Sequence, residues 1–480
     1  MAPDRWSLRL AVFLIAVTLL RLLALTLSKT DLFFDEAQYW SWAQALDFGY
    51  FSKPPLIAWI IWGTTSLCGD GEACVRASAP LFHAGSAVFL FLAGRALYDG
   101  RTGFWAAVIF ATLPGISFSA NIISTDVPLL FFWSAALYFG MKLQQERRWR
   151  WAVLLGLAIG LGALAKYAML YLYLCAGVWF VVSPASRWLL RDAKALVLIA
   201  IPLALLAPNL LWNLDNGLVT FAHTADNAKL GGPLVHPINM LEFLAAQLGV
   251  FGPILFPMLL VIAVRAVRRG AADQDRYLLA FSLPVLVLVT GIAFLSRAHA
   301  NWAAATYPAA TILVTATMLR LERRKLFAAT LAVNALCFVA LAVAPALADR
   351  LALPGDPFGR TLGWRETAES VRREVEKGTY GAILTDDRAM TAELLYYLRD
   401  SDIPILRWPS NGAPRDHYQL TRPFTGKAPE PVLFVTRGNP NRTVTERFST
   451  GERVGMVKIA AGRKMTRTVI LISLRGFKGG

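Results

Sequence analysis

Long apolar runs recur through the first 345 positions of the chain, separated by short polar segments. A hydrocarbon core about 30 Å thick is spanned by a helix of about 20 apolar residues, so each run is long enough to cross a membrane. The break at Lys166 divides one stretch of about 33 apolar residues into two spans, because one span needs fewer. The pattern predicts eleven spanning helices near residues 7–27, 77–98, 102–120, 127–143, 150–165, 167–183, 194–212, 241–264, 277–295, 303–320 and 326–346.

The last 130 or so residues lack such runs and alternate between two other patterns. "WRETAESVRREVEKG" and "AMTAELLYYLRD" predict helices, and "GAILTDD", "IPILRW", "PVLFVT", "VGMVKIA" and "RTVILISL" predict strands. We therefore expect a polytopic α-helical membrane domain over residues 1–346, with a first outer loop at 28–76, and a small α/β domain over 347–480. No glycine-rich phosphate fingerprint is visible in the α/β domain. We expect it to cover the outer membrane face without a catalytic role.

Composition agrees with a membrane protein: 56% of the residues are hydrophobic, 17% are charged and the mean hydropathy is +0.48. A net charge of +16 would suggest a nucleic-acid partner in a soluble protein. Here the charge sits mostly in short loops between apolar runs, which membrane topology explains, so we expect no nucleic acid. The first apolar run is too long for a signal peptide and lacks a small-residue cleavage site, which indicates a retained helix.

The basic residues also predict an orientation. If the N-terminus is cytoplasmic, nineteen lysines and arginines lie in cytoplasmic segments against six on the opposite side, namely Lys29, Lys53, Arg76, Lys166, Lys229 and Arg297. This asymmetry follows the positive-inside rule, and eleven spans then place the C-terminal domain outside. We expect a multi-pass protein of the bacterial inner membrane whose unusual residues gather on the outer face.

The first outer loop opens with "DLFFDEAQYW", in which Asp35 and Glu36 begin a predicted helix. Acidic residues at the start of a helix commonly interact with the helix dipole. This explains Glu36 well and Asp35 less well, because one acid would suffice. A carboxylate at the bilayer surface beside a lipid-linked substrate can also accept a proton from an incoming hydroxyl. Both are candidate catalytic residues. Tyr39 is a candidate substrate contact, and with its neighbouring tryptophans it suits a helix lying in the membrane interface.

Three further charged residues stand at expected helix boundaries. Lys53 precedes two prolines that fix where the next helix starts, which favours a placed cation over one that merely reaches headgroups. Asp126 in "STDVPLL" suits either a helix start or a substrate contact. Lys166 breaks two apolar spans, where a charge is costly unless it is paired or solvated. An anion in an outward cavity would meet that need.

Two outer segments combine polar and aromatic residues. "SRAHANW" carries Arg297 and His299, which suit a phosphate or a lipid headgroup, followed by Asn301 and Trp302. "PNLLWNLDNGLVTFAH" carries further candidates for sugar contacts, Asn213 and His223, although interface aromatics at a helix end would look the same.

Cys68 and Cys74 flank the turn "GDGEA", whose two glycines allow the Cα separation that a disulfide requires. The predicted topology places both cysteines in an oxidising compartment, so we expect either a disulfide or two free thiols. No histidine stands near them at a metal-ligand spacing. The sequence thus indicates no metal or other cofactor, although it leaves a divalent metal open.

Taken in order, "DEAQYW" with "YFSKPPL", "STDVPLLFFW", "LAKY", "PNLLWN" with "TFAH", and "HANW" with "YP" resemble the GT-C glycosyltransferases of the protein-mannosyltransferase type. The nearest branch looks like the bacterial enzymes that modify lipid A with aminoarabinose or galacturonic acid. The resemblance covers roughly residues 7–320. No single piece is specific, but the ordered set is.

The resemblance implies a sugar transfer from a polyprenyl-phosphate donor to an envelope lipid or glycan, with lipid A as the foremost acceptor. It implies Asp35 as the acid/base residue and Lys53 as a contact of the donor phosphate, aided by Arg297, His299 and Lys166. The aminoarabinose branch carries Glu before this lysine, whereas Ser52 stands here, which favours a neutral or acidic sugar.

A lipid or sugar transporter is the alternative function. It would also need outward charges and a groove accessible to lipids. Transporters commonly contain internal repeats with interrupted helices at matching positions and ionisable residues at mid-membrane. The two halves of this chain show no matching pair, and its charges cluster at one face. The pattern therefore favours the transferase.

Overall fold

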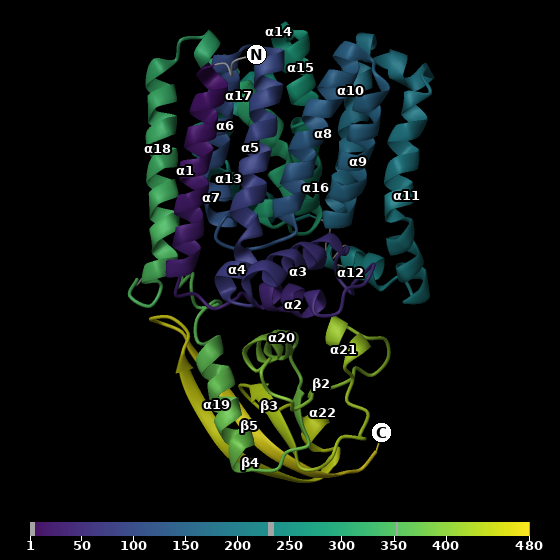
Figure 1. Cartoon of the computed structure of the whole chain (residues 1–480), viewed down its shortest axis with the longest axis vertical. Helices are drawn as coiled ribbons and strands as arrows, with labels where there is room; N and C mark the ends of the chain where they lie inside the picture. The colour runs from purple at the N-terminus through teal and green to yellow at the C-terminus, as the bar shows by residue number, and fades with distance from the viewer. Residues whose placement is uncertain (1–4, 229–234, 352–353, 480) are drawn as a thin grey trace. The chain divides into compact units, whose positions relative to one another are not determined.

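A computed structural model describes residues 5–228, 235–351 and 354–479 of the chain (Figure 1). Lys229, one of the predicted outer cations, lies outside the described residues. The contacts divide the chain into two compact units. We call Met1–Leu25, Lys53–Ile57 and Arg76–Val343 the helical unit, and Thr26–Ser52, Ala58–Val75 and Ala344–Gly480 the sheet unit. Segments of the first outer loop thus group with the C-terminal residues.

The helical unit contains the apolar helices in the order that the hydrophobic pattern predicts. They are α1 (Arg5–Leu27), α5 (Ser78–Leu97), α6 (Gly100–Thr112), α7 (Pro114–Ser119), α8 (Asp126–Glu146), α9 (Trp149–Ala165), η1 (Tyr167–Leu170), α10 (Tyr171–Val182), η2 (Pro184–Arg191), α11 (Lys194–Asp215), α12 (Val219–Ala228), α13 (Pro237–Val250), α14 (Leu255–Arg269), α15 (Asp273–Ala280), α16 (Leu283–Leu295), η3 (Ala300–Thr306), α17 (Tyr307–Arg320) and α18 (Arg324–Val343).

Three predicted spans are each divided between two α-helices, and in one of them, residues 277–295, α15 ends at Ala280 and α16 begins at Leu283. Residues 102–120 divide into α6 and α7 at Pro114, which has no N–H to continue the ladder. Residues 241–264 divide into α13 and α14, which are bent by 114° at Gly252, whose φ is +104°. Among the described residues, six helices are long and apolar enough to cross a membrane, or seven if the bent pair counts as one span.

The helices of this unit differ in how much of their surface is covered. Every residue of α17 from Tyr307 to Met318 is buried, whereas α1, α11 and α18 keep many apolar side chains exposed. α5 and α6 approach closely at Gly94 and Gly103, where an added Cβ on Gly94 would lie 2.9 Å from the Cα of Gly103. Small residues at helix contacts and apolar residues on outer faces are typical of membrane bundles.

The sheet unit consists of the first-loop helices and a C-terminal α/β fold. Its helices are α2 (Phe34–Ala43), most of α3 (Leu56–Cys68) and α4 (Glu72–Arg76), η4 (Ala344–Leu347), α19 (Trp364–Lys377), α20 (Arg388–Tyr397), α21 (His417–Thr421) and α22 (Arg442–Thr445). Its strands are β1 (Ala382–Thr385), β2 (Ile405–Arg407), β3 (Val432–Arg437), β4 (Phe448–Ala460) and β5 (Thr466–Phe477). The five predicted strands and both predicted helices are confirmed.

These strands form one mixed sheet in the order β2-β1-β3-β5-β4. β1 pairs in parallel with β2 and β3, and all four of its residues are buried, as expected for a parallel strand covered on both faces. β3 pairs antiparallel with β5, which forms a long hairpin with β4. Apolar side chains of β1, β3 and β5 form the core with Phe424, Val444 and Phe448.

Candidate active site

Asp35 and Glu36 have different surroundings although they are neighbours in the first turn of α2. Glu36 is 1% exposed, and its carboxylate accepts a hydrogen bond from the N–H of Phe33 at 2.9 Å. This contact closes the N-terminus of α2 in the manner of a capping box. Asp35 keeps 36% of its side chain exposed. The structure therefore supplies a structural role for Glu36 and leaves Asp35 as the accessible carboxylate.

Asp35 is paired with an arginine of the C-terminal fold. Nη1 of Arg388, in the first turn of α20, lies 3.0 Å from Oδ1 of Asp35 and donates to Oε1 of Gln38 at 2.9 Å. Both charged side chains remain about one-third exposed. The pair leaves about a third of the Asp35 side chain open, so the carboxylate can still be reached by the hydroxyl of a substrate.

The aromatic residues of α2 are buried, which corrects the interpretation of this helix as lying in the membrane interface. Tyr39 is 4% exposed and packs on Trp42, whose ring stacks on Tyr50 with centroids 4.5 Å apart. Trp40 meets the ring of Tyr396 edge-on. These rings build the core of the sheet unit, so Tyr39 has a packing role in this structure.

Lys53 lies directly before two prolines, at the position where the sequence predicts a cation held by a rigid backbone. Pro54 and Pro55 follow it, and α3 begins at Leu56, as the sequence predicts. The Lys53 side chain is half-buried, and Ser52 before it is buried.

Three predicted site residues meet in the helical unit. Asp126, the first residue of α8, accepts hydrogen bonds from Nζ of Lys166 and from Nδ2 of Asn301, each at 2.7 Å. The Lys166 and Asp126 side chains are 19% and 12% exposed. The anion that Lys166 requires is therefore a carboxylate of the chain itself. Asp126 and Asn301 also line an apolar cavity of about 340 Å³ together with Tyr307.

Asn213 belongs to a second cluster of polar side chains, which includes Tyr167. The Tyr167 hydroxyl donates to Oδ1 of Asn209 at 2.6 Å, and Asn213 donates to the Asn209 carbonyl and accepts from the N–H of Thr220. The Tyr167 ring stacks on Phe221 with centroids 5.2 Å apart. "LAKY", "PNLLWN" and "TFAH" thus lie together, with His223 half-buried in α12.

The basic residues of the segment before α17, residues 296–306, are exposed on the surface. Arg297 and His299 are exposed, and the imidazole of His299 meets the half-buried ring of Trp302 edge-on at 5.5 Å. Asn239 holds the segment by donating to the carbonyl of Ser296 at 2.5 Å.

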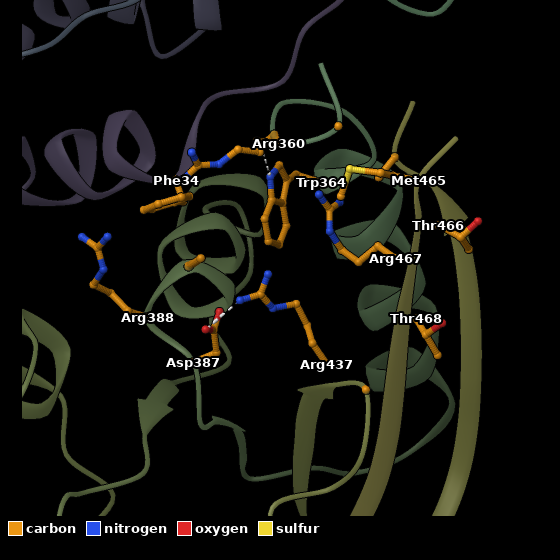
Figure 2. A pocket seen from close by; sticks show the side chains of 14 residues that line it. Phe34, Arg360, Trp364, Asp387, Arg388, Arg437, Met465, Thr466, Arg467 and Thr468 are labelled. Carbon is orange, nitrogen blue, oxygen red and sulfur yellow. Dashed lines mark hydrogen bonds and ion pairs between the residues drawn. The ribbon is translucent and has the colours of Figure 1, made fainter. Parts of the chain in front are cut away.

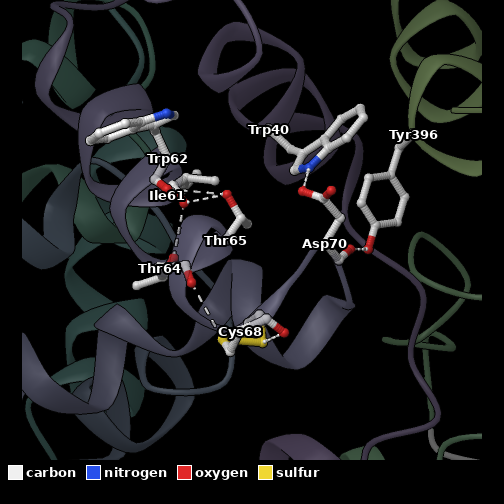
Figure 3. Close-up of a disulfide and its surroundings, with 9 residues drawn as sticks. Trp40, Ile61, Trp62, Thr64, Thr65, Cys68, Asp70 and Tyr396 are labelled. Atoms are coloured by element: carbon white, nitrogen blue, oxygen red, sulfur yellow. Dashed lines mark hydrogen bonds between the residues drawn. A yellow bond between two sulfur atoms is a disulfide. The ribbon is translucent and has the colours of Figure 1, made fainter.

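Cys68 and Cys74 are joined by a disulfide with a Cα separation of 5.9 Å (Figure 3). The bond links the end of α3 to α4, across a turn in which Asp70 accepts a hydrogen bond from Nε1 of Trp40 at 2.7 Å. Within the described ranges, no three His, Cys, Asp or Glu side chains lie close enough together to hold a metal ion.

Arg388 is the site residue that sequence reasoning missed. It lies more than three hundred residues from Asp35, and "DDRAMTAEL" reads as the start of an ordinary surface helix. No local pattern signals a partner at such a distance, so only the assembled sheet unit reveals the pair.

This arrangement of apolar helices with an acidic first loop is that of the GT-C glycosyltransferases. The crystal structure of ArnT from Cupriavidus metallidurans in the apo state covers 96% of this chain and 97% of its own, with a TM-score of 0.66 and 17% identity. The same protein bound to undecaprenyl phosphate gives a TM-score of 0.65 at 15% identity, with the same shares covered. At these identities the likeness shows the fold. The family model of dolichyl-phosphate-mannose-protein mannosyltransferases matches residues 52–212.

Sequence similarity to a curated protein is more specific. The lipid A galacturonosyltransferase RgtD of Rhizobium johnstonii is 37% identical over 436 residues, which are 89% of this chain and 90% of that protein. The chain therefore belongs to the lipid A galacturonosyltransferase family of GT-C enzymes, and it is a membrane glycosyltransferase. The resemblance that the sequence motifs indicated is confirmed.

Proposed function

We propose that the chain transfers galacturonic acid from a polyprenyl-phosphate donor to a lipid A-like acceptor on the outer face of the bacterial inner membrane. The observation that carries this proposal is the nearly end-to-end match to a lipid A galacturonosyltransferase. Ser52, which stands where the aminoarabinose branch has an acid, agrees with an acidic sugar. The undecaprenyl phosphate bound by ArnT supports the class of donor.

Asp35 acts as the general base in this proposal. It removes the proton from the acceptor hydroxyl while the oxygen attacks the anomeric carbon, and the bond from that carbon to the phosphate oxygen breaks. The polyprenyl phosphate leaves with the electron pair, and one displacement inverts the anomeric centre. An ionised phosphate oxygen would need no general base, so this role of Asp35 applies to a hydroxyl acceptor. The exposure of its carboxylate supports this role.

Lys53 and Arg297 contact the donor phosphate, with His299 beside them. Cations that face a leaving phosphate stabilise the charge that develops on it. Lys166 was expected to contact the donor phosphate. Its pairing with Asp126 instead supports a role in positioning that carboxylate. The cavity beside Asp126 and Asn301 is apolar with a polar edge, which suits the junction of a lipid chain and its headgroup.

The membrane arrangement in this proposal has eleven spans, a cytoplasmic N-terminus and a periplasmic C-terminal domain. The excess of lysine and arginine in alternate loops supports it. So do the helices at all eleven predicted apolar segments, three of which are divided between two α-helices. The sugar would then be transferred on the side where lipid-linked donors stand after crossing the membrane.

Transfer by the purified protein tests the proposal. We expect a galacturonic acid residue to appear on lipid A when the donor is polyprenyl-phosphate galacturonic acid, and little product with the aminoarabinose donor. A lipid product from the aminoarabinose donor alone would contradict the proposed sugar. Movement of intact donor between leaflets without a glycosylated product would favour a transporter.

The phosphate contacts have their own test. Lys53→Ala and Arg297→Ala should each raise the apparent KM for the donor about tenfold, since each removes a charge-assisted contact. Arg101→Ala is the matched control, because Arg101 is an exposed arginine near the start of α6. An unchanged donor KM in both variants would remove these residues from the phosphate site.

A further inference from the structure

Four arginines of the sheet unit line one cavity of about 730 Å³ (Figure 2). They come from separate places in the C-terminal fold: the loop before α19, the start of α20, the end of β3 and the start of β5. Phe34, the residue directly before Asp35, lines the same cavity. The four are Arg360, Arg388, Arg437 and Arg467.

Aromatic rings and carbonyl oxygens hold these guanidinium groups in place. Arg467 lies 3.6 Å above the ring of Trp364 and donates to the carbonyl of Leu362 at 3.0 Å. Arg360 lies over the ring of Phe33 at 4.6 Å, and Arg388 over Phe34 at 4.8 Å. Cations fixed over aromatic faces are ordered before any ligand arrives, so a ligand need not order them.

The cavity carries more positive than negative charge. Asp387 is the single carboxylate among its lining residues, and it pairs with Arg437 at 2.7 Å. Asp35, outside the lining, pairs with Arg388, so the four arginines outnumber the two carboxylates paired with them by two (4 − 2 = 2). Burial and the neighbouring Arg437 lower the pKa of Arg467 to about 10, so it remains charged at neutral pH. Arg437 and Arg467 lie close enough for their charges to repel, and an anion in the cavity would relieve that repulsion.

Arginines that only pack against aromatic rings are the simpler explanation of this cluster. Packing explains where each side chain lies, but not why four from distant segments converge on one cavity. Thr466 and Thr468 belong to the same lining, but their hydroxyl oxygens point away from the guanidinium groups (Figure 2). Several guanidinium forks match the oxygens of a phosphate better than the two oxygens of one carboxylate.

We propose that this cavity binds the phosphate-bearing headgroup of the acceptor lipid. The proposal rests on the proposed function, because it assigns the second substrate of that reaction. Arg388 carries the connection: it lines the cavity, and the same guanidinium group pairs with Asp35. A headgroup held here lies beside the carboxylate that accepts its proton. The C-terminal fold then recognises the acceptor, where the sequence predicted a cover without a catalytic role.

Titration of the detergent-purified full chain with inorganic phosphate tests the cavity at constant ionic strength. Arg437→Gln and Arg467→Gln should each raise the phosphate Kd about tenfold, since each removes a charge-assisted contact. Arg453→Gln is the matched control, because Arg453 is an exposed arginine of β4 outside the cavity. Asp387→Asn should lower the Kd, because it removes the only lining carboxylate and Asn can still cap α20.

The outcomes separate this inference from its alternatives. Equal phosphate affinity in the wild type, Arg437→Gln and Asp387→Asn would overturn it, and Asp387→Asn keeps this test available if an arginine variant fails to fold. Tighter binding of free galacturonate than of phosphate would also overturn it, in favour of a site for the donor sugar. If the wild type binds phosphate as expected but transfers no sugar, the proposed function fails and the anion site stands.

Discussion

At the scale of single residues, Asp31 shows how burial changes the chemistry of a carboxylate. It accepts hydrogen bonds from the N–H groups of Trp364 at 2.7 Å and Arg365 at 3.4 Å, and so caps the start of α19. Burial raises its pKa from 3.8 to about 6 in spite of these contacts. The folded chain therefore holds this proton more tightly than the unfolded chain does.

This shift predicts a pH-dependent effect of Asp31→Asn. The stability contributed by protonated Asp31 is complete below about pH 3.8 and is lost as the pH rises through about 6. Asn keeps the accepting oxygen without the charge. Between pH 4 and 7 the free energy of unfolding of the variant should therefore rise relative to that of the wild type, by up to about 3 kcal/mol. Thermal unfolding of both proteins across this range measures the gain. A difference independent of pH would contradict the expectation.

The contact between Lys166 and Asp126 predicts a coupling between the two residues. Lys166→Met or Asp126→Asn alone leaves a poorly solvated charge without its partner, so each should lower the free energy of unfolding by roughly 2 kcal/mol. The double variant should lose less than the sum of the two. Denaturation of the four proteins of the cycle in detergent measures the coupling, and strict additivity would argue against the pair.

At the scale of elements, the sequence predicted helices and strands well where proline, glycine and hydrophobic periodicity act locally. Pro54 and Pro55 marked the start of α3, and the strands of the C-terminal fold were recognisable from runs such as "PVLFVT". The breaks at Pro114 and Gly252 were missed, because the apolar composition continues across both. The pairing of Asp35 with Arg388 was beyond any local pattern, since assembly alone brings them together.

The disulfide between α3 and α4 gives a prediction for these elements. Alkylation with a membrane-impermeant reagent should label Cys68 and Cys74 only after reduction, because both sulfurs are bonded beforehand. Reduction should cost less than the roughly 3 kcal/mol expected for a 15-residue loop, since this loop is shorter. Equal labelling before reduction would exclude the bond, and labelling under neither condition would question the orientation.

At the scale of the whole molecule, the proposed transfer on the outer face requires the C-terminal residues to lie on the periplasmic side of the membrane. The basic residues predict a cytoplasmic N-terminus and a periplasmic C-terminus. Alkaline phosphatase fused after Gly480 should therefore be active, and a green fluorescent protein at the same position should be dark. The reverse pattern would place the sheet unit, and with it Asp35, in the cytoplasm.

Mass spectrometry of lipid A tests the central claim most directly, in cells that lack this protein and receive either the wild type or a variant. Asp349→Asn is the matched control for Asp35→Asn, since Asp349 is another partly exposed carboxylate of the sheet unit in an ion pair, with Lys29 at 2.9 Å. We predict galacturonic acid on lipid A with the wild type and Asp349→Asn, and none with an equally abundant Asp35→Asn. Unmodified lipid A with the wild type, or full modification with Asp35→Asn, would contradict the account.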